Sequence, residues 1–161
     1  MRRTILFLLL TLLTGALLVS CETEVREAIV NQEKYIDDYI QQNFEDFEVI
    51  RNQGVNSIIL VDTLLGAPAI EKGDSTFLFL AGHIFEQKGP TIQFVRDSGM
   101  FRVGTGDLIP GLDRGLVGAH LGERRLIIFT SKYGYGENAV GLVDENTALL
   151  FEVLVAAIKK D

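Results

Sequence analysis

The residues whose side chains could catalyse a reaction or bind a metal are few and poorly placed for either role. His83 and His120 are the two histidines, and neither has another histidine three or four positions away, as paired metal ligands on a helix require. The glycines of residues 104–106 lack the third glycine of a dinucleotide loop, and no G-x-S-x-G supplies a nucleophile. Glu123 and the acidic pair at 37–38 are expected to be solvated charges on a turn and a helix face. The sequence therefore predicts no metal, no cofactor and no covalent or acid–base catalysis.

Four short motifs rich in glycine and aromatic residues remain. They follow one another in the C-terminal half as IPGLDRGLVG at 109–118, GERR at 122–125, YGYG at 133–136 and LLFEV at 149–153. In order and spacing they resemble the motifs of the FKBP peptidyl-prolyl cis–trans isomerases. The resemblance extends over residues 55–160, roughly two-thirds of the chain.

This resemblance implies an enzyme that binds the X-Pro bonds of a polypeptide in an apolar pocket. Such a bond differs by only about 0.5–1 kcal/mol between cis and trans, but the barrier between them is about 18–20 kcal/mol. The twisted amide has lost resonance and is less polar than the planar one. An apolar pocket therefore favours the twisted state without a nucleophile or a metal.

The family resemblance also assigns the pocket residues. The backbone N–H of Ile109 and the hydroxyl of Tyr135 are expected to bind substrate carbonyl groups, and Phe151 to form a wall beside them. The other residues expected to bind the substrate are Leu80, Leu108, Leu112 and Leu142. The apolar members of this set could instead belong to an ordinary core, whereas Tyr135, which lies between two glycines, favours the pocket.

Several pocket positions depart from the family pattern. Leu112 stands where efficient members have a tryptophan floor, and Leu80 stands where they have a tyrosine. The family's Phe-Asp pair falls near residues 92–95, which contain no aspartate, although Asp97 could substitute; another pocket aromatic falls near Gly99. Each lost buried hydrogen bond weakens binding by about 0.5–1.5 kcal/mol. We therefore expect weak activity.

Short apolar runs broken by glycines must hold these residues in place. Runs typical of strands occupy residues 55–61, 76–81, 125–129 and 147–158, although the last run has a composition that also suits a helix. Residues 110–117 favour a short helix with Pro110 in its first turn. An amphipathic helix is expected over residues 24–43, with Thr23 as its N-cap. The predicted fold is α+β: an antiparallel sheet wrapped on one short helix, as in FKBP domains, preceded by an N-terminal helix.

The first residues of the chain are typical of an export signal. Two arginines precede an apolar stretch that is too short to span a membrane comfortably, and it ends in Leu18-Val19-Ser20-Cys21, which resembles a bacterial lipobox. By that resemblance Cys21 is lipidated. The expected organisation is a signal peptide at 1–20, a lipid tether and helix at 21–50, and an FKBP-like domain at 51–161. An uncleaved anchor or a plain signal peptide is the alternative.

Composition narrows the partners of this chain. Its 161 residues carry a net charge of −7, and such an acidic surface argues against binding a nucleic acid. The single cysteine excludes an internal disulfide. The sequence thus favours an envelope-facing, membrane-anchored isomerase that assists the folding of exported, proline-containing proteins. The alternatives are an FKBP-like chaperone with weak or no catalysis, and a purely structural lipoprotein.

Overall fold

The computed structural model describes the backbone of residues 2–61 and 66–161, with side chains from residue 22 onward in those ranges. The helices are α1 (Arg2–Asn43), α2 (Pro110–Leu116) and a single 3-10 turn, η1 (Ser131–Tyr133). The strands are β1 (Val49–Asn52), β2 (Val55–Val61), β3 (Ser75–Glu86), β4 (Gly89–Arg102), β5 (Arg124–Phe129) and β6 (Ala148–Lys159). They form one antiparallel sheet in the order β1-β2-β5-β6-β3-β4, so β1 and β4 are its two edges.

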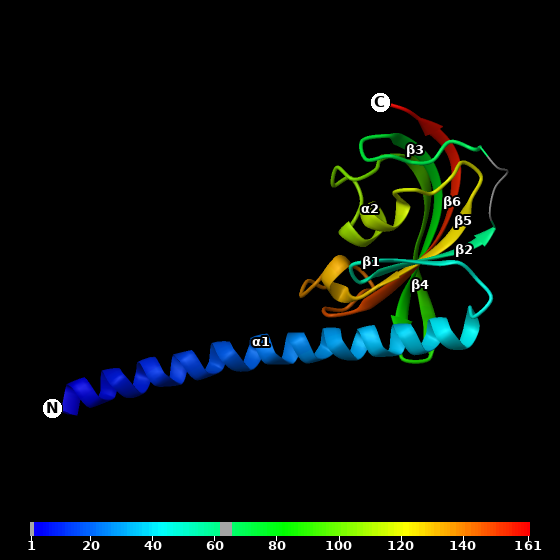
Figure 1. Cartoon of the computed structure of the whole chain (residues 1–161). Coiled ribbons are helices and arrows are strands. Elements are labelled where there is room, and N and C mark those ends of the chain that lie inside the picture. The colour runs from blue at the N-terminus through cyan, green and yellow to red at the C-terminus, as the bar shows by residue number, and fades with distance from the viewer. Residues whose placement is uncertain (1, 62–65) are drawn as a thin grey trace.

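One face of the sheet packs against α2 and forms the main core. Because successive side chains of a strand point to opposite faces, alternate residues of β3 and β6 are buried on this side. Leu78 and Val153 belong to the buried set, whereas Phe79 and Leu154 lie on the opposite, exposed face. Figure 1 shows the long strands curving around α2. The fold is therefore the predicted α+β arrangement of a sheet wrapped on one short helix.

The C-terminal part of α1 covers the lower end of the opposite face. Ile36 and Ile40 are buried there in a second apolar cluster with residues such as Leu150 of β6. Figure 1 shows α1 (cyan) crossing the end of the sheet where β3 turns into β4. In that turn Gly89 has a φ of +120°, and a Cβ there would lie 2.8 Å from the Tyr39 ring. Within residues 22–61 and 66–161, no helix is long and apolar enough to cross a membrane.

Tyr35 lies on the same surface of α1. Burial, together with the nearby negative charge of Glu86, raises the pKa of its hydroxyl to about 12. The hydroxyl is therefore protonated at neutral pH and donates a long hydrogen bond of 3.4 Å to the Phe85 carbonyl. Its ring also packs against Phe85, with centroids 5.8 Å apart.

A buried ion pair lies at the start of β5 and is hydrogen-bonded to α2. Glu123 is fully buried and accepts hydrogen bonds from the Arg125 guanidinium and, at 2.9 Å, from the His120 backbone N–H. Arg125, 1% exposed, donates a second bond of 2.6 Å to the Gly115 carbonyl in α2. The expectation that Glu123 is a solvated charge is therefore wrong, because its carboxylate satisfies a buried guanidinium and a turn amide.

Several local predictions are confirmed and others are corrected. The strand at Val55–Val61 and the helix that begins at Pro110 are present, and the C-terminal run is strand β6 rather than a helix. Thr23 is not an N-cap, because α1 runs through it without interruption. The edge strands β1 and β4 were not expected.

Candidate active site

An apolar cluster lies between α2, β3, β4, β6 and the loop after η1. It gathers three buried leucine and phenylalanine residues, Leu80, Leu112 and Phe151, and three half-buried residues, Leu108, Ile109 and Tyr135. All the residues predicted for the pocket therefore belong to the main core or pack against it, except Leu142, which is 66% exposed in the same loop as Tyr135. Their roles in binding a substrate stay predictions.

Phe151 is the centre of the aromatic packing in this cluster. Phe94 of β4 meets its ring edge-on, with centroids 5.7 Å apart, and Phe129 stacks against it at 6.0 Å. The Phe94 ring also lies 6.4 Å from the ring of Tyr135, again edge-on. A Cβ on Gly82 would lie 2.6 Å from the Phe151 ring, so only glycine allows β3 to approach it this closely. These contacts fix the wall of the site.

Phe94 is the pocket residue that the sequence left ambiguous. Of the two apolar candidates near the expected Phe-Asp pair, Phe94 packs in the cluster, whereas Ile92 is exposed. Val95 follows Phe94 and lies opposite Gly82. Asp97 lies opposite Leu80 in the sheet, exposed, and its carboxylate accepts the backbone N–H of the next residue at 2.7 Å. The aromatic type of Phe94 is the one feature of the sequence that indicates this position. The shifts in register between β3 and β4 prevent its alignment with the family's Phe-Asp pair from the sequence alone.

Two hydrogen-bond donors border the apolar cluster. Ile109 precedes α2, and its carbonyl accepts the backbone N–H groups of Leu112 and Asp113 at 3.0 and 3.1 Å. Within the described part of the chain no group accepts a bond from the Ile109 N–H, as expected for an amide ahead of a helix. The Tyr135 hydroxyl likewise has no acceptor among the described residues. Both donors are therefore available to carbonyl groups of a bound chain.

The loop that carries Leu108 and Ile109 is held by one carboxylate. The two oxygens of Asp113 in α2 accept the backbone N–H groups of Gly104 and Gly106, each at 2.9 Å. Both bonds reach back from the helix across the loop that leads into it. The helix therefore positions the residues that precede it, through Gly104 and Gly106.

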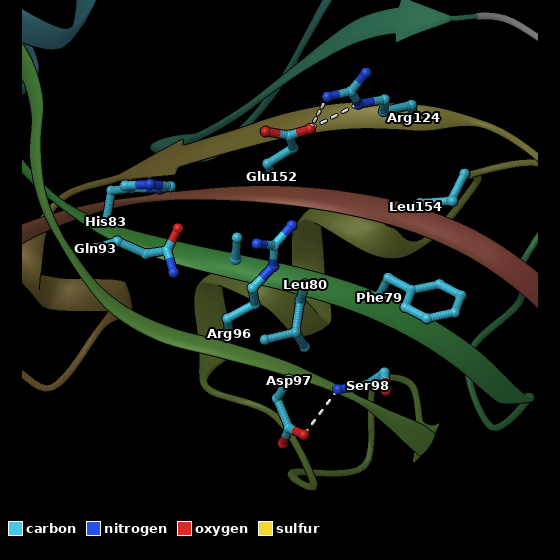
Figure 2. A pocket seen from close by; sticks show the side chains of 11 residues that line it. Phe79, Leu80, His83, Gln93, Arg96, Asp97, Ser98, Arg124, Glu152 and Leu154 are labelled. Carbon is cyan, nitrogen blue, oxygen red and sulfur yellow. Dashed lines mark hydrogen bonds and ion pairs between the residues drawn. The ribbon is translucent and has the colours of Figure 1, made fainter.

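A separate hollow of about 680 Å³ lies on the opposite face of the sheet (Figure 2). Figure 2 shows side chains of β3, β4, β5 and β6 around it, with the Arg124–Glu152 ion pair on β5 and β6 and the ring of Phe79 on β3. Arg96 of β4 extends over it. This hollow mixes charged and apolar groups; Leu80, which the sequence predicts for the pocket, is among its lining residues, but Tyr135 and Ile109 are not. It is therefore not the pocket that the motifs predict.

Comparisons with known proteins agree with this geometry. The family described as FKBP-type peptidyl-prolyl cis-trans isomerase matches residues 74–156. FK506-binding protein 1 of Aspergillus oryzae is 31% identical over an alignment of 97 residues; the match covers 53% of this chain and 84% of that protein. FK506-binding protein 2 of Gibberella zeae is 31% identical over 91 residues, 55% of this chain, and the match spans only 46% of that longer protein.

Solved structures show the same fold. A peptidyl-prolyl cis-trans isomerase from Pseudomonas syringae superposes with a TM-score of 0.67 at 18% identity, over 84% of this chain and 96% of that one. The three FKBP domains of wheat FKBP73 give a TM-score of 0.62 at 21% identity, over 71% of this chain and 50% of that one. With half of its length matched by the family and the pocket motifs gathered in one cluster, this chain belongs to the FKBP-type peptidyl-prolyl cis–trans isomerases.

Proposed function

We propose that this FKBP-type isomerase acts on X-Pro bonds of exported polypeptides, at the outer surface of a membrane to which Cys21 anchors it. The observation that carries the catalytic part is the apolar cluster around Phe151, bordered by the free N–H of Ile109 and the Tyr135 hydroxyl. A proline ring seated in this cluster would be separated from water. The two donors would hold the carbonyl groups of the chain on either side of it.

The reaction needs no group that forms a covalent bond to the substrate. Because the planar amide carries more charge on its oxygen and nitrogen than the twisted one, an apolar wall stabilises the twisted state relative to it. The hydrogen bonds fix the substrate backbone while the X-Pro bond turns, so that less freedom is lost at the barrier. Leu112 keeps the floor apolar, since it is only 3% exposed and packs in the same cluster.

Replacing Tyr135 by phenylalanine tests the catalytic part. The change removes one hydroxyl and its bond to a substrate carbonyl, so kcat/KM should fall about 3–10-fold, the equivalent of one net hydrogen bond. NMR exchange spectroscopy on an X-Pro peptide, with catalytic amounts of the full chain in detergent, measures it. The matched control is Tyr133→Phe, because that ring lies under the Arg114 guanidinium, 4.7 Å away, and beside Gly54 rather than in the pocket.

The outcomes of this experiment separate the proposal from its main alternative. Equal loss in both tyrosine variants would exclude a specific role for Tyr135. If the wild-type chain leaves the exchange rate at its uncatalysed value while peptide resonances shift, the domain binds polypeptide without catalysis. Leu80 and Val95, apolar where the family has polar groups, give that alternative its support.

The tether at Cys21 is tested by the mass of the mature protein. In bacterial cells the wild-type chain should begin at an acylated Cys21, since several acyl chains at about 0.8 kcal/mol per buried methylene hold a protein stably on a membrane. Cys21→Ala should keep residues 1–20 and carry no lipid, whereas Ser20→Ala, which keeps a small residue before the cysteine, should be processed normally. An identical, lipid-free mass for wild type and Cys21→Ala would exclude the tether.

A further inference from the structure

The side chain of Gln32 is a buried amide on the surface of α1 that faces the domain. It is 5% exposed, and both ends of the amide make backbone hydrogen bonds. Its Nε2 donates to the Asn146 carbonyl at 2.6 Å, and its Oε1 accepts the Ser131 N–H at 2.8 Å. These partners lie more than 90 residues further along the chain. They are also the second and the last but one residues of the segment between β5 and β6, which carries Tyr135.

Inside that segment, hydrogen bonds link the same two residues around Tyr135. The Ser131 carbonyl accepts the N–H groups of Gly134 and Gly136, each at 2.9 Å. The Gly136 carbonyl in turn accepts the Asn146 N–H at 2.7 Å. The helix amide closes this chain of bonds into a ring. Of the two glycines that flank Tyr135, Gly136 is a member of the ring and Gly134 donates to the same Ser131 carbonyl, so the backbone of Tyr135 is held on either side.

The position of α1 does not depend on this loop. Ile36 and Ile40 are buried against the sheet, and the Tyr39 ring lies over the β3–β4 turn with its centroid 5.0 Å from that of Phe85. Apolar contacts therefore fix the helix on β3, β5 and β6. The two hydrogen bonds of the Gln32 amide join the loop of residues 131–146 to this helix, so the position of the helix sets the position of the loop.

We infer that Gln32 is a positioning residue that sets the Tyr135 hydroxyl relative to Phe94 and the Ile109 N–H, and so makes α1 part of the active site. The inference deepens the proposed function and rests on it. Without the amide, the Ser131 N–H and the Asn146 carbonyl lose their partners, and a buried group without one is costly. The segment must then move toward water, and Tyr135 moves with it.

Gln32→Met tests this, because methionine matches the length of glutamine but forms no comparable hydrogen bonds. In the full chain, kcat/KM for an X-Pro peptide should fall about 3–10-fold and no further than in Tyr135→Phe, since displacing the hydroxyl cannot cost more than removing its hydrogen bond. The matched control is Ile36→Val, which loosens the same helix without touching the loop. It should lower the melting temperature and leave kcat/KM within about twofold.

A double-mutant cycle shows whether the effect passes through Tyr135. Independent losses multiply, whereas coupled ones do not. If Gln32 acts by placing the hydroxyl, then Gln32→Met combined with Tyr135→Phe should be little slower than Tyr135→Phe alone. If the losses of kcat/KM in the two single variants multiply in full in the double variant, the inference is overturned. A loss in Ile36→Val as large as that in Gln32→Met would overturn it as well.

A structural measurement keeps this test separate from the test of catalysis. In isotope-labelled full chain, nuclear Overhauser contacts between the Phe94 and Tyr135 rings report the loop position whether or not the protein catalyses exchange. Gln32→Met should weaken these contacts and shift the amide resonances of Gly134 and Gly136, and Ile36→Val should do neither. Unchanged contacts in Gln32→Met would overturn the inference even in an active enzyme. Absent catalysis with changed contacts would instead contradict only the proposed function.

Discussion

Replacing Arg125 by methionine should lower the free energy of unfolding by about 3–5 kcal/mol, the cost of leaving one partner of a buried ion pair alone. Glu123 has no exposed surface, so its carboxylate would lose its guanidinium and keep the backbone N–H of His120 and, at 3.4 Å, the His120 ring Nδ1. The Gly115 carbonyl in α2 would also lose the bond of 2.6 Å that Arg125 donates. Denaturant unfolding followed by circular dichroism measures the change.

Arg124→Met is the matched control, one residue earlier on the same strand. Arg124 pairs with Glu152 on the exposed face, and exposed pairs contribute about 0–1 kcal/mol. The double variant Glu123→Leu with Arg125→Met should recover part of the lost stability, because no unpaired charge stays buried. A loss below about 1 kcal/mol for Arg125→Met would show that water reaches Glu123 in solution.

Replacing Phe151 by alanine should abolish measurable catalysis and lower the free energy of unfolding by about 3–5 kcal/mol, as for other buried aromatic residues. The ring contacts both Phe94 and Phe129, so its loss removes the wall of the site and leaves a cavity. Water entering that cavity would stabilise the planar amide and so remove the preference for the twisted one. Exchange spectroscopy is done at a temperature where the variant is folded.

Ile58→Ala controls for the loss of stability in this experiment. Ile58 is equally buried, but it lies on β2 in the second apolar cluster with Ile36 and Ile40, on the face of the sheet away from α2. Its replacement should destabilise the fold and leave kcat/KM within a few-fold. Retained catalysis in Phe151→Ala would mean that the substrate binds elsewhere, for instance in the hollow on the opposite face.

The sequence predicted the parts of this fold whose patterns are local. The glycine and aromatic motifs indicated α2, β5, β6 and the cluster around Phe151. Strand β4 was missed because, as an edge strand, it is largely exposed on both faces and shows no alternation of apolar and polar residues. The contacts of Gln32 join residues 99 and 114 positions apart, and no local pattern reports them.

The burial of Glu123 could have been predicted from its neighbours. In a strand, Arg125, Ile127 and Phe129 point to one face; because Leu126 and Ile128 make the other face apolar too, both faces of this strand are expected to be buried, the one with Arg125 included. An arginine that points into a core needs an anion, and Glu123 is the acidic residue beside it. The prediction failed because Glu123 was considered by itself, as a charge on a turn.

The order of the strands also determines which strand edges are open to pairing with an unfolded polypeptide. The sheet ends in β1 and β4, and an open strand edge can template the pairing of another chain into an aggregate. β1 has only four residues, and β4 begins with Gly89-Pro90 and carries Arg96 and Asp97 beside shifts in register. Short length, proline, charge and bulges all hinder an incoming strand. A client is thereby discouraged from adding to the sheet as a further strand.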